Sequence, residues 1–423
     1  MRFIPSTHID NLSKYKYSGI DKSITSRFIL NPFWNRLVLL FPKWIAPNTI
    51  TFSGLCIIFV NFATMLAFDP KFKVDQALPS WVYWSWGIGL FAYQSMDAID
   101  GKQARRTGMA GPLGEMFDHG CDAMNTSLEV ILAAHALNLG RSWWTVASQA
   151  ASLSNFYLTT WEEYHTGTLY LSVFSGPVEG ILMICVLYCI TGVYGPTFWD
   201  QSIIQFFKLD SVVPALGENK RLMDLGLNDS FMIFGAISLA FNVWGSYSNV
   251  VVARRSKGQP INTPLRGLVP FMVQLSALLA WLAADYPTST RILYSDNFLY
   301  FLGFVGFGFA YQVGTMILAH VTKMPFPMWN GWMVWTAIGA LDANLPNLFG
   351  VSPVIQSTQT KSSGFILLSL FVALAIYLNF AFSVIWQITE YTGIACFTVR
   401  KKDQSGHWVK AAKAEEEKRV KSL

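Results

Sequence analysis

Two pairs of aspartates in the middle of the chain have the residue type and spacing needed to bind metal. Asp97 and Asp100 are three residues apart, and Asp118 and Asp122 are four apart. Residues at these spacings share one face of a helix. Between the pairs, Pro112 suits the first turn of a new helix, and the short connection makes the two helices antiparallel neighbours. We therefore expect the four carboxylates to lie close together, where the ends of the two helices meet.

These carboxylates need a positive partner, because like charges repel strongly in a medium of low dielectric constant. Oxygen-only ligands favour Mg²⁺, Mn²⁺ or Ca²⁺, and two ions bridged by shared carboxylates are typical of phosphoryl transfer. The alternative is a set of structural ion pairs with Lys102, Arg105 and Arg106. We favour metal, because ionisable clusters inside membrane spans are usually functional.

The elements that carry these aspartates belong to a membrane protein. Hydrophobic residues make up 52% of the 423 residues, charged residues only 13%, and the mean hydropathy is +0.35. Soluble domains carry about 25% charged residues, and a spanning helix needs roughly 20 mostly apolar residues. The expected fold class is therefore all-α: a polytopic integral membrane protein of about ten transmembrane helices, near 45–68, 81–99, 114–139, 142–161, 177–195, 229–253, 266–284, 297–319, 328–345 and 364–388.

Basic residues predict the orientation, since they gather on the cytoplasmic side of a membrane. They are concentrated in the N-terminal segment, the C-terminal tail, the 97–113 loop and the 254–266 loop. Both termini and the 97–113 loop are therefore predicted to be cytoplasmic. Residues 22–43 mix apolar and basic positions, which predicts an amphipathic helix in the headgroup plane, with a plain polar leader as the alternative. The five cysteines form no C-x-x-C pair and are expected to be free thiols.

The residues around the aspartates also follow a recognisable pattern. The fixed positions of D-x2-D-G-x2-A-R-x8-G-x3-D-x3-D are all filled, by Asp97, Asp100, Gly101, Ala104, Arg105, Gly114, Asp118 and Asp122. This stretch resembles the hallmark of the CDP-alcohol phosphotransferase family. The segments YKYSG, WIAPNTITFSG, PLGEMFDHGCD, WEEYHTGTLYL and GPVEG extend the resemblance over much of the first 200 residues. They resemble the eukaryotic choline/ethanolamine phosphotransferase branch, especially its fungal members.

The resemblance implies a reaction. Phosphocholine or phosphoethanolamine would pass from CDP-choline or CDP-ethanolamine to diacylglycerol, giving phosphatidylcholine or phosphatidylethanolamine and CMP. It also implies two divalent ions, Mg²⁺ with Mn²⁺ as a substitute. Asp97 and Asp118 would bridge the two ions, Asp100 would complete one site and Asp122 the other.

Three further residues are implicated in binding the CDP-alcohol. The resemblance implies that Asn48 and Arg105 contact it, and the planar fork of Arg105 suits phosphate. Without the resemblance, Asn48 beside a proline would indicate only a helix start. Gly101 permits either close helix packing or close approach of a nucleotide to the backbone, whereas Gly114 alone indicates helix packing.

The general base for the lipid hydroxyl is a choice between two residues. His119 has an intrinsic pKa suited to neutral pH, and Glu115, one turn earlier, could orient it. Its alternative role is to orient Asp118. Asp122 is the rival base, but binding metal would lower its basicity, so we favour His119.

A choline head group favours aromatic neighbours, because a quaternary ammonium cannot donate hydrogen bonds. Trp161, Glu162, Glu163 and Tyr164 are candidates, with Tyr93 near the aspartates. Packing in an interfacial aromatic belt is the alternative for each aromatic residue.

The resemblance also implies four regions and a location. Residues 1–43 are expected to form a cytoplasmic segment with the interfacial helix, 44–253 the catalytic transmembrane core, 254–390 the C-terminal transmembrane helices, and 391–423 a cytoplasmic charged tail. The expected location is the endoplasmic reticulum or Golgi, with the active site facing the cytosol. A homodimer in contact with membrane lipids is expected, and no nucleic-acid partner.

Two other functions could use the same carboxylates. A phosphatidylinositol, phosphatidylserine or phosphatidylglycerol synthase would share the motif but use another alcohol. A cation transporter would explain intramembrane acids, but not the glycines and arginine at fixed spacing. A pore would also disperse its acids over several spans, whereas these gather at two adjacent helix ends.

Overall fold

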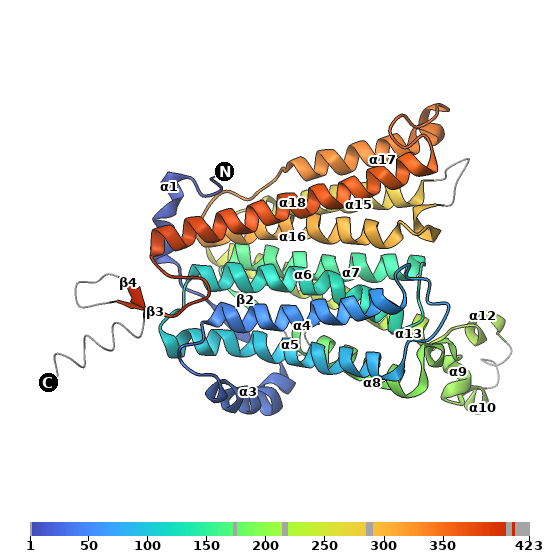
Figure 1. Ribbon diagram of the computed structural model, residues 1–423, viewed down its shortest axis with the longest axis horizontal. Helices are drawn as coiled ribbons and strands as arrows, with labels where there is room; N and C mark the ends of the chain where they lie inside the picture. The colour runs from blue at the N-terminus through green and yellow to red at the C-terminus, as the bar shows by residue number, and fades with distance from the viewer. Residues whose placement is uncertain (1, 172–175, 214–218, 285–290, 403–407, 411–423) are drawn as a thin grey trace.

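A computed structural model describes residues 2–171, 176–213, 219–284, 291–402 and 408–410. Within these ranges, ten helices of at least 14 residues run side by side along the long axis of the molecule (Figure 1). They are α4 (Pro47–Phe68), α5 (Ser80–Thr107), α6 (Pro112–Ala136), α7 (Trp143–Thr166), α8 (Ile181–Tyr194), α13 (Leu227–Ser256), α15 (Val269–Ala283), α16 (Phe298–Thr322), α17 (Gly331–Phe349) and α18 (Gln359–Thr392).

The remaining elements are short and lie at the ends of this bundle. They are α1 (Ser6–Ile9), α2 (Asn11–Lys14), α3 (Asn31–Leu37), α9 (Ile203–Phe206), α10 (Leu209–Val212), α12 (Lys220–Met223), α14 (Asn262–Leu265) and the strands β1 (Gly19–Asp21), β2 (Leu169–Leu171), β3 (Arg400–Lys402) and β4 (Trp408–Lys410). β1 pairs in parallel with β2, and β3 pairs antiparallel with β4. The rest of the predicted charged tail lies outside the described residues.

Each of the ten predicted apolar runs overlaps one of the long helices. Among the described residues, six helices are long and apolar enough to cross a membrane: 47–68, 177–194, 227–256, 262–283, 298–322 and 359–392. The protein is therefore helical and suited to a membrane. Apolar side chains on the outer helices support this, since on α13 Phe241 and Trp244 remain 73% and 71% exposed.

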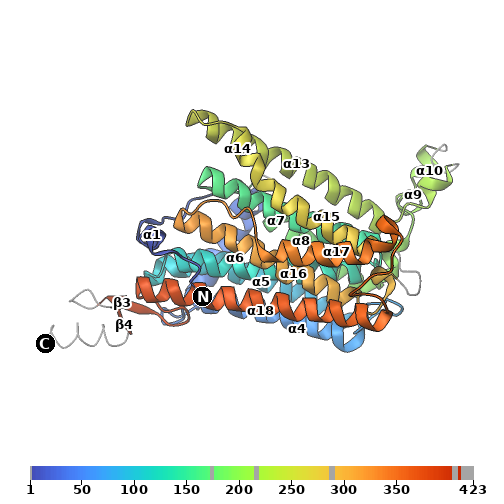
Figure 2. The same cartoon turned by 90° about the horizontal axis from the view of Figure 1, so that it is seen from above.

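The bundle is organised around α16. This helix is mostly buried, and α6, α7 and α18 pack against it. α13 lies on the outside against α7 (Figure 2). Since α6 and α7 also carry site residues, the burial of α16 fixes the depth and rotation of the helices that build the site.

α5 extends further than the apolar run predicted. The run was expected near 81–99, but the helix continues to Thr107 and ends at Gly108, which has φ +71°. From Ser80 to Thr107 there is no proline and no glycine with positive φ that would end the helix earlier. Arg105 and Arg106 in the last turn interact favourably with the negative end of the helix dipole. The expected 97–113 loop is therefore only the turn 108–111, and Asp97 to Arg106 all lie on a helix.

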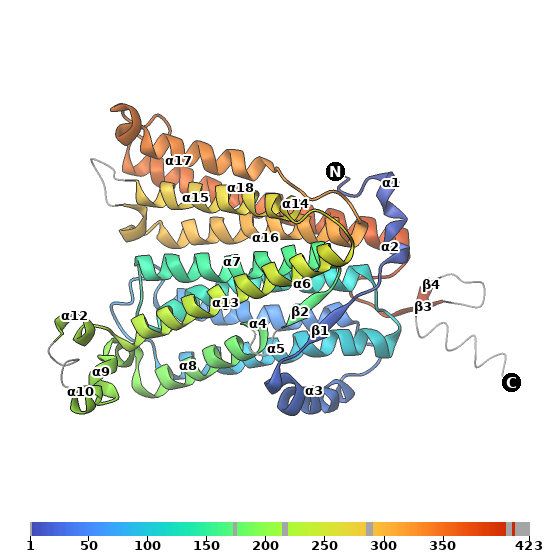
Figure 3. The ribbon, with the colours of Figure 1, turned by 180° about the vertical axis from the view of Figure 1, so that it is seen from behind.

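The segment predicted to be an interfacial helix is a chain of short helical turns. A π-helical turn at Ser26–Leu30, α3 and a 3-10 turn at Val38–Leu40 follow one another. Their inner side chains pack against α4 and α5, whereas Phe28 and Leu40 are exposed. Figure 3 shows α3 beside α5 at the edge of the bundle, with β1 running from α2 towards it.

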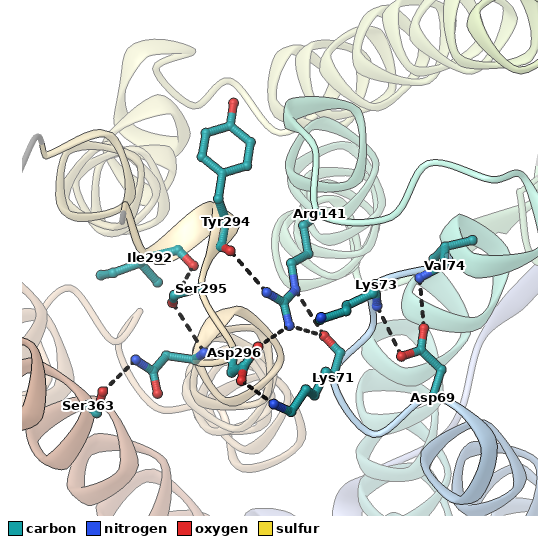
Figure 4. A network of polar contacts seen from close by, with 11 residues as sticks. Asp69, Lys71, Lys73, Val74, Arg141, Ile292, Tyr294, Ser295, Asp296 and Ser363 are labelled. Carbon is teal, nitrogen blue, oxygen red and sulfur yellow. Dashed lines mark hydrogen bonds and ion pairs between the residues drawn. The ribbon is translucent and has the colours of Figure 1, made fainter. Parts of the chain in front are cut away.

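A polar network ties the loops at the opposite end of the bundle from the aspartates (Figure 4). Arg141 donates to the carbonyl of Lys71 at 2.9 Å and to that of Tyr294 at 3.0 Å. Asp296 pairs with Arg141 at 2.7 Å and with Lys71 at 2.8 Å. These hydrogen bonds from Lys71 and Arg141 lower the pKa of Asp296 to about 2, so Asp296 is ionised at neutral pH. The network joins the ends of α4, α6 and α16.

Candidate metal and substrate site

The facing ends of α5 and α6 bring the aspartates together. Asp97, Asp100 and Asp118 each present a carboxylate oxygen, and these three atoms lie within 4.8 Å of one another. The hydroxyl of Thr51 donates to Asp100. Asp122, one turn further along α6, accepts a hydrogen bond of 2.6 Å from the phenol of Tyr93 on α5. Three carboxylates thus form a cluster, and the fourth is held beside it.

The donor set fits a hard divalent cation. One carboxylate oxygen of Asp97 and one of Asp118 are buried and have no hydrogen-bond partner among the described residues. Leaving such oxygens unpaired in a low-dielectric site is costly, and a cation would satisfy them. All the available ligand atoms are oxygens, which is the chemistry that Mg²⁺ and Mn²⁺ prefer.

Two of the three basic residues that could have formed structural ion pairs, Lys102 and Arg106, face away from the aspartates. Lys102 donates to the side chains of Asn31 at 3.2 Å and Asn35 at 2.9 Å. Arg106 donates to the carbonyl of Phe41 at 3.2 Å and to that of Val38. In the described part of the chain, neither residue forms an ion pair with the four aspartates. The two bases instead hold the N-terminal segment against α5.

The two motif glycines face open space. A Cβ on Gly114 would meet no atom within 4 Å, and one on Gly101 would meet only the guanidinium of Arg105, at 3.7 Å. Neither glycine is therefore needed for close contact with a neighbouring helix. The exposed side chain of Arg105 lies over Gly101 on the same face, which leaves room for a ligand beside backbone and guanidinium.

Asn48 lies in the first turn of α4. Its contact with Cys396 was not predicted from the sequence. Its side-chain nitrogen lies 3.5 Å from the sulfur of Cys396. A cavity of about 10 Å³ is present here, lined by Pro47, Asn48, Met109, Leu113, Gly114, Ile394, Ala395 and Cys396. The segment after α18 therefore covers the start of α4, and nothing in the short Ile-Ala-Cys run indicated this contact.

His119 is oriented by a backbone carbonyl. Its Nδ1 lies 3.1 Å from the carbonyl oxygen of Glu115 and 3.9 Å from Asp118. Its Nε2 faces the carboxylate of Glu163 at 3.7 Å. The expected orientation by the Glu115 carboxylate is not formed, because that carboxylate is directed to His320, 3.9 Å away. His320 was missed in the sequence, where it is one histidine at the end of an apolar run.

Of the four head-group candidates on α7, Glu163 is close to a proposed site residue, since its carboxylate lies 3.7 Å from His119. The indole of Trp161 donates to the carbonyl of Pro264 at 2.9 Å, and the phenol of Tyr164 donates to that of Met324 at 2.8 Å. Glu162 accepts a hydrogen bond from Asn249 of α13. These three residues pack α7 against its neighbours, so no aromatic box forms from Trp161 and Tyr164.

Comparisons with known proteins agree with this geometry. The sequence profile of the CDP-alcohol phosphatidyltransferase family matches residues 44–206. An uncharacterised class-I member of that family from Schizosaccharomyces pombe is 41% identical, over 94% of this chain and 97% of its own. Cholinephosphotransferase 1 and choline/ethanolaminephosphotransferase 1 of Saccharomyces cerevisiae are 38% and 36% identical, each over 94% of this chain and 98% of its own. With the motif residues gathered at one site and the similarity spanning nearly the whole length, this chain belongs to the CDP-alcohol phosphatidyltransferase family.

Proposed function

We propose that this protein transfers phosphocholine or phosphoethanolamine from the corresponding CDP-alcohol to diacylglycerol and releases CMP. The observation that carries the proposal is the cluster of Asp97, Asp100 and Asp118 within 4.8 Å, on the motif positions of the family. Relatives over nearly the full length, named cholinephosphotransferase and choline/ethanolaminephosphotransferase, support this choice of head groups.

In this proposal the four aspartates hold two Mg²⁺ ions, with Mn²⁺ as a substitute. Asp97 and Asp118 would be shared, Asp100 would complete one site and Asp122 the other. When bound, the ions neutralise the pyrophosphate and stabilise the charge on the transferred group. Thr51 and Tyr93 keep the carboxylates of Asp100 and Asp122 in place through their hydroxyls.

The remaining site residues bind substrate and move the proton. Arg105 and Asn48 contact the CDP-alcohol, and Gly101 lets it approach the backbone. The Nδ1–H of His119 donates to the Glu115 carbonyl, which leaves the Nε2 lone pair free. Nε2 then accepts the proton of the lipid hydroxyl as that oxygen attacks the phosphorus next to the head group in line with departing CMP. No phosphoenzyme is required.

The test of this function is direct. The purified protein in diacylglycerol-containing vesicles should convert labelled CDP-choline, CDP-ethanolamine or both into the matching phospholipid, with one CMP released per product. Transfer to neither would contradict the proposal. Cation uptake into the vesicles without any CMP release would favour the transporter alternative.

We also propose ten membrane spans, with the site at the cytosolic end and residence in the endoplasmic reticulum or Golgi as a homodimer. The ten long helices and the concentration of basic residues support this arrangement. So does the position of α1 and β3 at the same end of the bundle (Figure 1). Residues 22–43, with exposed Phe28 and Leu40, would lie in the cytosolic headgroup plane.

The orientation predicts which positions a membrane-impermeant maleimide reaches in sealed microsomes. A cysteine at exposed Ala110, in the turn between α5 and α6, should label without detergent, as should tags on both termini. A cysteine at exposed Asp75, at the other end of the bundle, should label only after permeabilisation. Termini that label from opposite sides would exclude an even number of spans.

A further inference from the structure

A second cluster of ionisable side chains lies beside the aspartates. Glu115 of α6, Glu163 of α7 and His320 of α16 each present one atom within 4.8 Å of the others. All three are buried, at 7%, 3% and 6% exposure. Three helices therefore converge on one enclosed position that the mechanism above leaves without a role.

This cluster carries more negative than positive charge. Both carboxylate oxygens of Glu115 are buried without a hydrogen-bond partner among the described residues. The basic groups closest to the two acids are imidazoles: His320 lies 3.9 Å from Glu115, and His119 lies 3.7 Å from Glu163. Lys323 follows α16 with an exposed side chain and forms no ion pair with either acid in the described ranges. Two buried carboxylates in this setting favour a cationic ligand.

The position of the cluster matches one part of the substrate. Glu115 precedes Asp118 by three residues, which is about 4.5 Å along the helix axis. His119 bridges the two clusters, 3.9 Å from Asp118 on one side and 3.7 Å from Glu163 on the other. In phosphocholine and phosphoethanolamine, two carbons separate the ester oxygen from a positively charged nitrogen. A phosphoryl group at the aspartates therefore places this nitrogen about one helical turn away.

The side chains around this cluster suit both the quaternary ammonium of choline and the primary ammonium of ethanolamine. The ring of Tyr15 lies edge-on to His320, with 6.2 Å between ring centroids, and aromatic side chains favour a quaternary ammonium. The unpartnered oxygens of Glu115 can accept hydrogen bonds from a primary ammonium.

We propose that Glu115, Glu163 and His320 form the subsite for the cationic nitrogen of the transferred head group, an inference that rests on the function proposed above. The two carboxylates select a positively charged alcohol over neutral ones such as inositol or glycerol. His320 holds the carboxylate of Glu115 in position.

The experiment compares CDP-choline with its neutral isostere, CDP-3,3-dimethylbutanol, in which carbon replaces the quaternary nitrogen. Wild type should prefer the cation at least tenfold in kcat/KM. Glu163→Gln and Glu115→Gln should lower kcat/KM for CDP-choline by about 10- to 100-fold, the effect of about 1.4 to 2.8 kcal/mol. The loss should be much smaller for the isostere, so the preference disappears, whereas any loss that acts through His119, which Glu163 faces at 3.7 Å, affects both substrates equally.

Glu162→Gln is the matched control, because it makes the same change at the neighbouring buried residue, which is bonded to Asn249 at 2.6 Å. This variant should keep the wild-type preference. Melting temperature identifies any variant that fails to fold, and in that case the other of the two glutamate variants decides.

Three outcomes separate the explanations. Equal losses for both substrates in Glu163→Gln, with the preference intact, would overturn the subsite. An unchanged preference with a shifted Mg²⁺ midpoint would replace the subsite with a metal site. A wild type that uses neither CDP-choline nor CDP-ethanolamine would instead contradict the proposed function itself.

Discussion

Asp118→Ala and Asp97→Ala should each abolish turnover while the protein remains folded. The two carboxylates contribute to the 4.8 Å cluster and carry the buried oxygens without partners. Removing one takes away a shared metal ligand, so we expect kcat to fall by at least about 10²- to 10³-fold, the scale of losing one electrostatic contact to the transition state. Phosphotransfer in vesicles, measured across a Mg²⁺ titration, checks this result.

Although the two alanine substitutions remove activity, they should not lower the stability of the metal-free protein. Without metal, Asp97, Asp100 and Asp118 are like charges held together in a site of low dielectric constant, so removing one relieves repulsion. In EDTA, the alanine variants should melt at or above the wild-type temperature. Loss of activity together with a lower melting temperature would indicate misfolding rather than loss of metal.

Asp224→Ala is the control, because Asp224 is exposed and directly follows α12, away from the motif. It should keep wild-type activity and the wild-type response to metal. Excess EDTA should stop the wild type, and Mg²⁺ or Mn²⁺ should restore it. Full activity of the wild type in excess EDTA would contradict the metal mechanism.

The parts of the site that the sequence predicted are those set by local geometry. Aspartates three or four residues apart must share a helix face, and Pro112 after a short turn must start an antiparallel neighbour. The same logic predicted the ten helical runs, since apolar length is a local property. The end of α5 was predicted less well, because the predicted apolar run ends near residue 99, whereas the helix continues until Gly108 allows a left-handed turn.

The parts that the sequence did not predict come from distant segments. His320 reaches the site only because α16 packs against both α6 and α7, and Cys396 reaches Asn48 across 348 residues of sequence. The direction of Lys102 away from the aspartates depends on Asn31 and Asn35. Such contacts depend on how the helices are rotated and packed against one another. They could not be predicted, because the sequence has no periodic pattern or motif at those positions.

The geometry of His119 favours it over Asp122 as the general base. Its Nδ1 donates to the Glu115 carbonyl, and its Nε2 lies 3.7 Å from Glu163, so in the described part of the chain neither nitrogen is hydrogen-bonded to one of the four aspartates. Asp122 instead accepts from Tyr93 beside that cluster. The ring of His119 is therefore free to take a proton without leaving a metal ligand, whereas a proton on Asp122 would compete with metal.

His119→Ala should accordingly lower kcat by about 10²- to 10⁴-fold, the usual contribution of a general base. The Mg²⁺ midpoint and the affinity for CDP-choline should stay near the wild-type values, because the four carboxylates and Arg105 are untouched. Asp122→Asn should instead shift the Mg²⁺ midpoint upward, since a neutral amide replaces a charged ligand. Titrating Mg²⁺ against turnover in both variants separates the two effects. If His119→Ala kept its kcat, and Asp122→Asn lost turnover at an unchanged Mg²⁺ midpoint, the roles would be exchanged and Asp122 would be the base.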